Sequence, residues 1–156
     1  MTEQRIRIEH EGGKAVLTTP EEMAKLAGGT FPLRERVEGG VGEAFDFAAW
    51  YEAWRREQGL TEDDPHPTHM KVEAADTFEA QIPWAQLGNA AFQYAQEGKP
   101  LVKGGPIRLY APNGSSECLN VKSVVVCRFL HLEHDQDEAS YGFKNTFSPQ
   151  EMLKKR

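Results

Sequence analysis

The stretch LNVKSVVVCRFLHL, residues 119–132, decides which fold we expect for this chain. Its middle is apolar at successive positions, which indicates a long strand covered on both faces and therefore central in a sheet. The stretch PIRLYAP, residues 106–112, alternates and predicts a second strand. Arg108 stands between Ile107 and Leu109 in that alternation, so we expect its side chain on the face opposite to theirs.

Segments nearer the N-terminus predict further extended structure. Residues 5–10 and 14–19 are separated by Gly12 and Gly13, a pattern that predicts a short hairpin. Residues 71–83, KVEAADTFEAQIP, are also expected to be extended.

A compact set of start and stop signals predicts a helix over residues 20–27. Thr19 can cap it, Pro20 suits the first helical position, and Glu22 completes a capping box. Gly28 can end the helix.

Two longer segments also predict helices. Residues 47–58 follow Asp46 as a capping residue and place aromatic side chains at positions i, i+3, i+4 and i+7. These aromatic residues are Phe47, Trp50, Tyr51 and Trp54. At this spacing they indicate the buried face of a helix rather than a cofactor site. A further helix is predicted over residues 84–97, opened by Pro83 and ended by Gly98.

Short helices set among several strands, without regular βαβ alternation, predict the fold class α+β with a mixed, mainly β sheet core. We expect the helices that carry Trp50 and Trp84 to pack against one sheet that contains residues 105–111 and 119–132. A chain of 156 residues fits one domain, residues 1–156.

The composition excludes several classes of protein. With 39% hydrophobic residues, 27% charged residues and a formal net charge of −6, the chain resembles folded soluble proteins and not nucleic-acid binders. It has no run of about 18 apolar residues that could span a membrane and no signal peptide, so we expect a cytoplasmic location. Cys118 and Cys127 form neither a CxxC pair nor a disulfide framework, and we expect both to be free thiols.

Positive charge is concentrated in residues 98–122, GKPLVKGGPIRLYAPNGSSECLNVK. The basic residues are Lys99, Lys103, Arg108 and Lys122, and they stand against one acid, Glu117. The same stretch contains Gly104, Gly105 and Gly114. A phosphate dianion favours arginine for its fork geometry, lysine as a point charge, and glycine where the backbone must approach closely.

These residues carry a resemblance to a known family. The run DTFEAQIPWAQLGNAAFQYAQEGKPLVKGGPIRLYAPNG, followed by NVKSVVVCRFLHL, resembles the second half of the sulfite-oxidase-like molybdopterin-binding domain. The matching motifs are GKPL at 98–101, GGPIR at 104–108, Pro112 with Gly114, and Val121 with Lys122. The resemblance is strongest over residues 76–132, weaker upstream, and poor in the tail, residues 135–156. It implies a sulfite-oxidase-like molybdopterin-binding fold.

The resemblance also implies a cofactor site. In that family, basic residues of the two matched strands and amides of the loop between them hold the phosphate of the pterin. In this sequence the corresponding residues are Arg108, Lys122, Lys103, Gly105 and Gly114. We therefore expect molybdopterin, or another phosphate-bearing small molecule, as the ligand. The alternative is that Arg108 and Lys122 are solvated strand charges beside an ordinary hairpin.

Molybdenum itself is not expected. Active members of the family bind the metal through a cysteine thiolate in the first half of the domain, and this chain has no cysteine before Cys118. One alternative is a molybdenum-dependent oxidoreductase in which Cys118 has become the ligand. Another is a structural or partner-binding domain that keeps only the fold.

Two histidine pairs suggest an unrelated metal site. His66 with His69, and His131 with His134 before the acidic run at 135–138, could bind zinc or a similar ion. Neither pair lies in a predicted helix that would place both rings on one face. We therefore interpret them as structural residues and the acidic run as a solvated turn.

Overall fold

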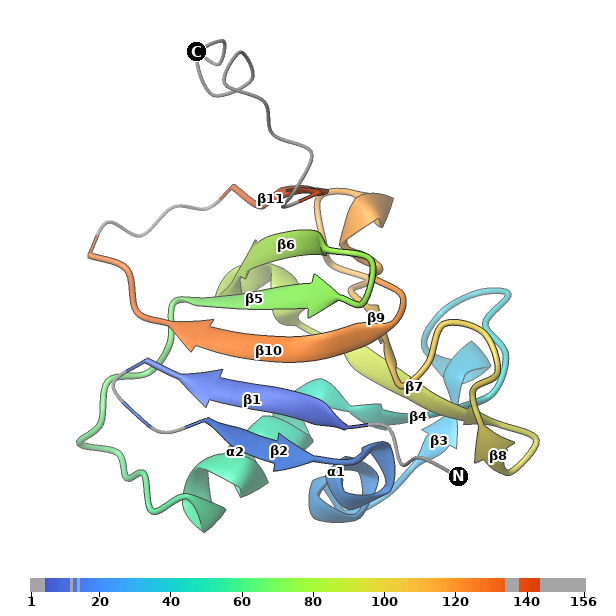
Figure 1. Ribbon diagram of the computed structural model, residues 1–156, viewed down its shortest axis with the longest axis horizontal. Coiled ribbons are helices and arrows are strands. Elements are labelled where there is room, and N and C mark those ends of the chain that lie inside the picture. The colour runs from blue at the N-terminus through green and yellow to red at the C-terminus, as the bar shows by residue number, and fades with distance from the viewer. Residues whose placement is uncertain (1–4, 12, 14, 134–137, 144–156) are drawn as a thin grey trace, which may run out of the picture.

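The computed structural model describes residues 5–11, 13, 15–133 and 138–143, and it has mixed α+β architecture that is mainly β (Figure 1). The predicted fold class is therefore confirmed at this level. The first sheet has the order β11 (Ser140–Phe143), β6 (Phe78–Pro83), β5 (His69–Ala74), β10 (Val124–Leu130), β1 (Ile6–His10) and β2 (Val16–Thr18). The second has the order β3 (Phe31–Pro32), β4 (Glu43–Asp46), β7 (Ala91–Gln96) and β8 (Lys99–Pro100), with β9 (Arg108–Tyr110) also paired to β7.

Strand β10 is central in the first sheet, as its apolar sequence predicts. It runs parallel to β1 on one side and antiparallel to β5 on the other. The strand is shorter than expected, because Leu119 ends a 3-10 helix, η3 (Glu117–Leu119), and regular pairing begins at Val124. Its outer face is not covered, since Arg128 lies there in a row of charged side chains.

The opening hairpin and the first helix agree with the local sequence signals. Strands β1 and β2 pair antiparallel, and α1 (Pro20–Ala27) follows. The Thr19 hydroxyl accepts a hydrogen bond from the Glu22 N–H at 3.2 Å, and the Glu22 carboxylate accepts one from the Thr19 N–H at 3.2 Å. Gly28 ends the helix with a positive φ of 85°.

Helix α2 (Phe47–Glu57) lies behind the first sheet in the view of Figure 1 and buries the predicted aromatic stripe. Asp46 caps it by accepting a hydrogen bond from the Ala49 N–H at 2.8 Å. Its four aromatic side chains surround Phe129 of β10, and the rings of Tyr51 and Phe129 are only 4.6 Å apart between centroids. This cluster is the centre of the main hydrophobic core.

The prediction of a helix over residues 84–97 is wrong. Only a 3-10 turn, η2 (Trp84–Leu87), forms there, and β7 follows. Gly88 is extended and Asn89 has a φ of 60°, so the helical path ends after one turn. Pairing of β7 with β4, β8 and β9 and burial of Phe92 outweigh the weak helical preference of this segment.

Residues 71–83 also differ in detail from the expectation. They are not one extended segment, because Thr77 has a φ of 75° and turns the chain between β5 and β6.

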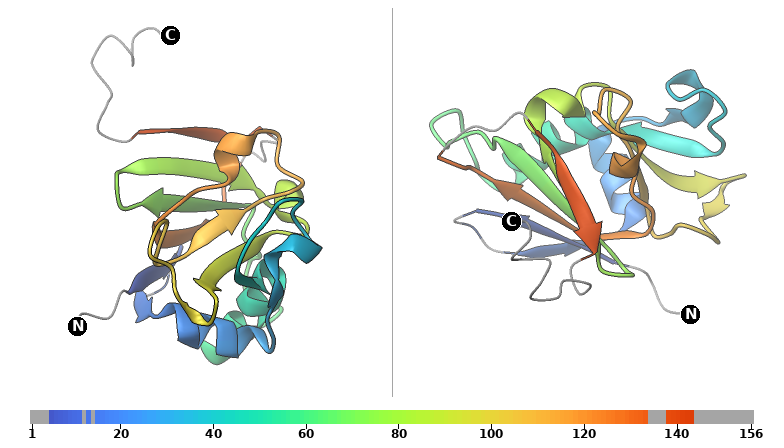
Figure 2. Two further views of the ribbon diagram at one scale, coloured as in Figure 1. Left: turned by 90° about the vertical axis from the view of Figure 1, so that its right-hand side faces the viewer. Right: turned by 90° about the horizontal axis from the view of Figure 1, so that it is seen from above.

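The expected placement of residues 105–111 and 119–132 in one sheet is also wrong. Strand β9 belongs to the second sheet and β10 to the first, and a single bridge between Ile107 and Val124 joins their segments. Figure 2 shows the two sheets at an angle to each other, with the helices beside them. The core is therefore shared by two sheets, which Trp50 and Phe92 help to connect through a T-shaped ring contact.

We predict that Trp50→Ala lowers the free energy of unfolding by about 3–5 kcal/mol, because this side chain is fully buried among other rings. Trp84→Ala is expected to cost less, since Trp84 is only partly buried against the same cluster. Urea unfolding followed by circular dichroism measures both values. Equal losses for the two variants would contradict this account of the core.

Candidate functional site

The backbone places Arg108 opposite Lys122. The Leu109 N–H donates to the Val121 carbonyl at 2.8 Å, and the Val124 N–H donates to the Ile107 carbonyl at 2.9 Å. These two bonds lie on either side of Arg108 in one segment, and on either side of Lys122 and Ser123 in the other. The resemblance placed both residues at one site, and the structure brings their backbones side by side.

The loop before β9, which contains Gly104, lies against the Lys122 segment. The Ser123 N–H donates to the Gly104 carbonyl at 2.9 Å, which holds the loop against the Lys122 segment. A Cβ atom added to Gly104, whose φ is 80°, would lie 3.9 Å from Cδ of Arg108. Gly104 thus lies beside the Arg108 side chain, and Lys103 and Gly105 are its neighbours in the sequence. We call Lys103, Gly104, Gly105, Arg108 and Lys122 the cationic patch.

Arg108 itself has an unusual environment. Ile107 and Leu109 are fully buried while Arg108 is half-buried, so its side chain occupies the opposite face, as predicted. The guanidinium carbon lies 5.0 Å from the centroid of the Tyr110 ring. Its Nε is shielded from solvent and has no hydrogen-bond partner among the described residues. A buried donor left unpaired is costly, so this atom calls for an explanation.

Gly114, the other glycine expected at the site, lies in the turn after β9. Its N–H donates to the Ala111 carbonyl at 2.9 Å, and the next amide, of Ser115, donates to Oε1 of Gln86 at 2.9 Å. A Cβ added to Gly114 would lie 2.9 Å from Cδ1 of Leu119, so close packing accounts for glycine here. In this conformation neither amide is available to a ligand.

Cys118 lies beyond the same turn. It is exposed on η3, where its N–H donates to Oγ of Ser116 at 3.0 Å. Cys127 is buried in β10, and burial raises the pKa of its thiol to about 12. Both cysteines are free, as predicted.

The histidine pairs do not form a metal centre within the described residues. The His66 ring packs edge-on against Trp84 at 4.7 Å between centroids, and His69 is fully buried with Nδ1 2.7 Å from the Thr68 hydroxyl. In the part of the chain that the structure describes, no three His, Cys, Asp or Glu side chains are grouped to hold a metal. His134 and residues 135–137 lie outside the described residues.

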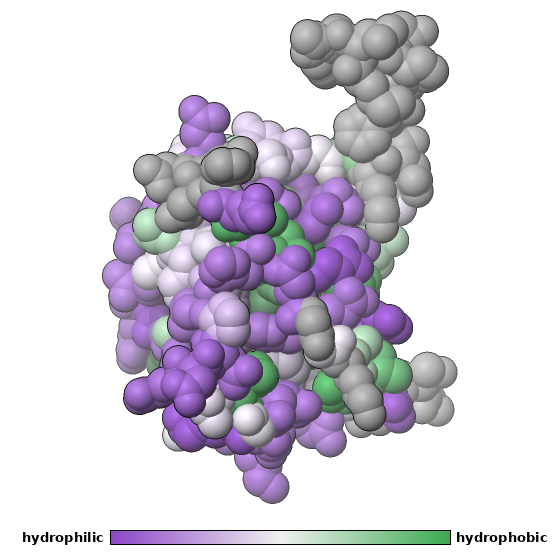
Figure 3. Space-filling view, turned by 90° about the vertical axis from the view of Figure 1, so that its left-hand side faces the viewer, coloured by the Kyte–Doolittle hydropathy of each residue, from purple (hydrophilic) through white to green (hydrophobic). Residues whose placement is uncertain are grey.

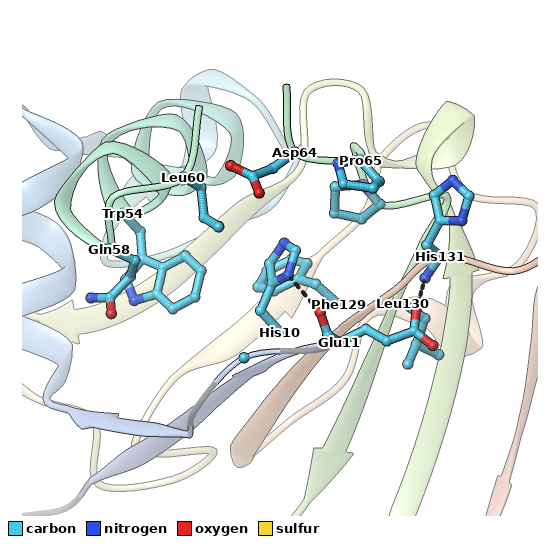
Figure 4. A pocket seen from close by; sticks show the side chains of 12 residues that line it. His10, Glu11, Trp54, Gln58, Leu60, Asp64, Pro65, Phe129, Leu130 and His131 are labelled. Atoms are coloured by element: carbon cyan, nitrogen blue, oxygen red, sulfur yellow. Dashed lines mark hydrogen bonds between the residues drawn. The ribbon is translucent and has the colours of Figure 1, made fainter. Parts of the chain in front are cut away.

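A pocket that the sequence did not indicate lies at the far end of β10. It has a volume of about 520 Å³, and its lining includes His10, Trp54, Asp64, Phe129 and His131 (Figure 4). Figure 3 shows this end of the molecule, where hydrophobic side chains are visible between hydrophilic ones. The lining residues come from separate segments of the chain. His10 stands alone at the end of a predicted strand, and one such histidine does not indicate a pocket.

Hydrogen bonds connect His10 to Tyr51 and Arg55 at the edge of this pocket. Nη1 of Arg55 donates to the Tyr51 hydroxyl at 3.2 Å, and this hydroxyl lies 3.0 Å from Nε2 of His10. Arginine can only donate, so the Tyr51 hydroxyl accepts from Arg55, and Nδ1 of His10 lies 3.4 Å from the Glu11 carbonyl oxygen. Burial lowers the pKa of His10 and raises that of Tyr51. Both groups are therefore neutral at neutral pH.

Comparison of the sequence with protein-family models and with curated proteins finds no match. Among the described helices, none combines the length and the apolar character needed to cross a bilayer.

The partly buried, neutral state of His10 predicts a pH dependence of stability. Because the pKa of His10 is lowered in the folded state, the unfolded chain binds the proton first as the pH falls. The stabilisation is complete above the ordinary histidine pKa of about 6.5 and decreases below it. We expect the stability advantage of the wild type over His10→Gln to shrink between about pH 7.5 and pH 5. Urea unfolding at each pH measures it, and a constant difference would contradict the assignment.

Proposed function

We propose that this protein binds a phosphate-bearing small molecule of the pterin type at the cationic patch, without catalytic molybdenum. In this proposal the chain is a divergent member of the sulfite-oxidase-like molybdopterin-binding family. The observation that carries the proposal is the buried Nε of Arg108, which lacks a hydrogen-bond partner within the described structure. A phosphate oxygen is the type of acceptor that would satisfy it.

The surroundings of Arg108 support an anionic ligand. Lys103 and Lys122 are both exposed, so their ammonium groups are free to turn toward a ligand held by the guanidinium. Gly104 leaves the space beside the Arg108 side chain open. The chain has a net charge of −6, so a local excess of basic residues at a glycine loop is not explained by the overall composition.

The residues of the patch fit the phosphate of molybdopterin better than they fit a bound metal. Molybdopterin would supply a dithiolene pair of sulfurs for a metal, and Arg108, Lys122 and Lys103 would hold its phosphate. No thiol occurs before Cys118, which lies on η3, four residues before Lys122. The first half of the chain, where the resemblance places the thiolate ligand, therefore has none.

We predict that inorganic phosphate and a pterin phosphate bind with measurable heat, and that Arg108→Ala weakens binding at least about tenfold through loss of charge-assisted hydrogen bonds. Lys122→Ala is expected to weaken it less, because lysine contributes a single point charge. Isothermal titration calorimetry measures each Kd. The matched control is Arg56→Ala, which removes an exposed arginine of α2 and should leave the Kd unchanged.

Two results would overturn this proposal. One is the absence of binding heat in the wild type, which would favour a structural or partner-binding domain. The other is an equal loss in Arg108→Ala and Arg56→Ala, which would reflect general electrostatics. Raising the salt concentration separates specific binding from diffuse attraction, because a specific arginine contact retains more of its affinity than diffuse attraction does.

We also predict that protein purified from a host able to make the pterin cofactor contains no stoichiometric molybdenum. The physical reason is the lack of a protein thiolate in the first half of the chain. Elemental analysis by mass spectrometry measures the metal content. Near-stoichiometric molybdenum that disappears in Cys118→Ser would instead show that Cys118 is the ligand.

A further inference from the structure

The core-facing side of the first sheet continues onto its edge strand β11, away from helix α2 (Figure 1). Tyr141 and Phe143 of β11 lie opposite Ala80 and Phe78 of β6. Residues opposite each other in an antiparallel pair share one face, and Ala80 is fully buried in the core. Tyr141 and Phe143 therefore project from the same side of the sheet as the core.

The aromatic side chains at this edge are partly open to solvent. Tyr141 is 49% exposed and Phe143 is 41% exposed. The Phe78 ring lies between the core and these two rings, 5.1 Å from Phe143 and 6.3 Å from Tyr141 between centroids. We call Phe78, Tyr141 and Phe143 the β11 patch. Covering such rings with another apolar element is favourable, because it removes their exposed area from water.

The sequence directly after β11, KNTFSPQEMLKKR (residues 144–156), contains a helix-start signal. These residues lie outside the described part of the chain, and the signal is read from their sequence. Ser148 suits the N-cap position, Pro149 the first helical position and Glu151 the third, which together make a capping box. The pattern predicts a helix that begins at Pro149.

The apolar residues of this segment complete the signal. Phe147 stands directly before the N-cap and Met152 at the fourth helical position, the two places whose side chains pack together as a hydrophobic staple. Leu153 follows Met152 and extends the apolar side. Isolated helices shorter than about 12 residues are marginal in water, so a helix over residues 149–156 needs an apolar surface to pack against.

The β11 patch is within reach of this helix. Residues 144–147 connect Phe143 to Ser148, and four residues span at most about 14 Å. Because Phe143 is itself part of the patch, the predicted helix starts beside it. A tethered segment at so short a distance has a high effective concentration at the patch.

Charge also favours docking of the segment at this edge. It carries four basic residues against one acid, in a chain whose net charge is −6. Two exposed carboxylates lie near Phe78. Asp76 accepts a hydrogen bond from the Phe78 N–H at 3.1 Å, and Glu117 begins η3, which contacts β6. These carboxylates attract the basic segment. Its basic residues are Lys144, Lys154, Lys155 and Arg156.

From these observations we propose that residues 149–156 form a helix that docks on the β11 patch and covers the rings of Phe78, Tyr141 and Phe143. Phe147, Met152 and Leu153 provide the apolar side of the contact. The docked segment closes the core at the sheet edge and holds β11 against β6. This contact is independent of phosphate binding at the cationic patch.

Hydrogen–deuterium exchange of the full chain, followed by mass spectrometry, tests the proposal. We expect the amides of residues 150–156 to exchange at least about tenfold more slowly in the protein than in a synthetic peptide of residues 144–156, because docking closes their hydrogen bonds. Met152→Asp and Tyr141→Asp place a charge on the two sides of the contact. Each should return these amides to the exchange rate of the peptide.

Two matched variants serve as controls. Leu17→Asp places the same charge at a leucine that is 57% exposed on β2, the opposite edge of the same sheet, and should leave the exchange of residues 150–156 unchanged. Gln150→Glu adds a negative charge in the first turn of the predicted helix, where the helix dipole favours it, and should not reduce protection. Circular dichroism melting shows whether each variant remains folded.

Three outcomes would overturn the proposal. The first is exchange of residues 150–156 at the peptide rate in the wild type, and the second is protection that persists in both Met152→Asp and Tyr141→Asp. The third is protection that increases with protein concentration, which would assign the β11 patch to a second copy of the chain. Arg108→Ala should leave the exchange unchanged, so failure of the phosphate site and failure of this contact are distinguished.

Discussion

The packing of the aromatic face of α2 against Phe129 is the interaction on which the rest of the structure depends. Phe129 contacts the rings of Phe47, Trp50, Tyr51 and Trp54, and it lies on the central strand of the six-stranded sheet. This contact holds the helix on the sheet and joins both to the second sheet through Phe92. It also leaves Trp54 and His10 at the rim of the core, where they form the pocket wall. The pocket is therefore a consequence of how the core closes.

The opposite face of β10 carries hydrogen-bonded charged side chains instead of packed aromatic rings. Arg128 donates to Glu9 of β1 and to Glu73 of β5 at 2.6 Å each, so one guanidinium connects both neighbouring strands. The hydrogen bond from Arg128 is the main cause of the lowered pKa of Glu9. This row of charges faces solvent, which explains why the strand alternates between buried and partly exposed residues after Val126 instead of being covered on both faces.

Local signals in the sequence predicted local structure well. The capping box at Thr19, the Asp46 cap and the aromatic spacing of α2 each depend on residues within one or two turns, and all three formed as expected. The β7 segment failed because its pairing with β4, β8 and β9 is set by residues far away in the chain. The same distinction applies to the sites. The cationic patch comes from one short stretch and was visible as charge, whereas the pocket joins segments around His10, Trp54, Asp64 and Phe129 and left no pattern to detect.

The two candidate sites lie at opposite ends of β10, and their separation determines what they can do together. The patch contacts the chain next to Val124, and the pocket is lined by Leu130. Seven residues of strand span roughly 20 Å, which is about twice the Debye length at physiological salt. Charges at the two ends are thus largely screened from each other. A pterin whose phosphate lies on Arg108 would place its ring too far away to reach the His10 pocket, so this pocket is not part of the proposed phosphate site.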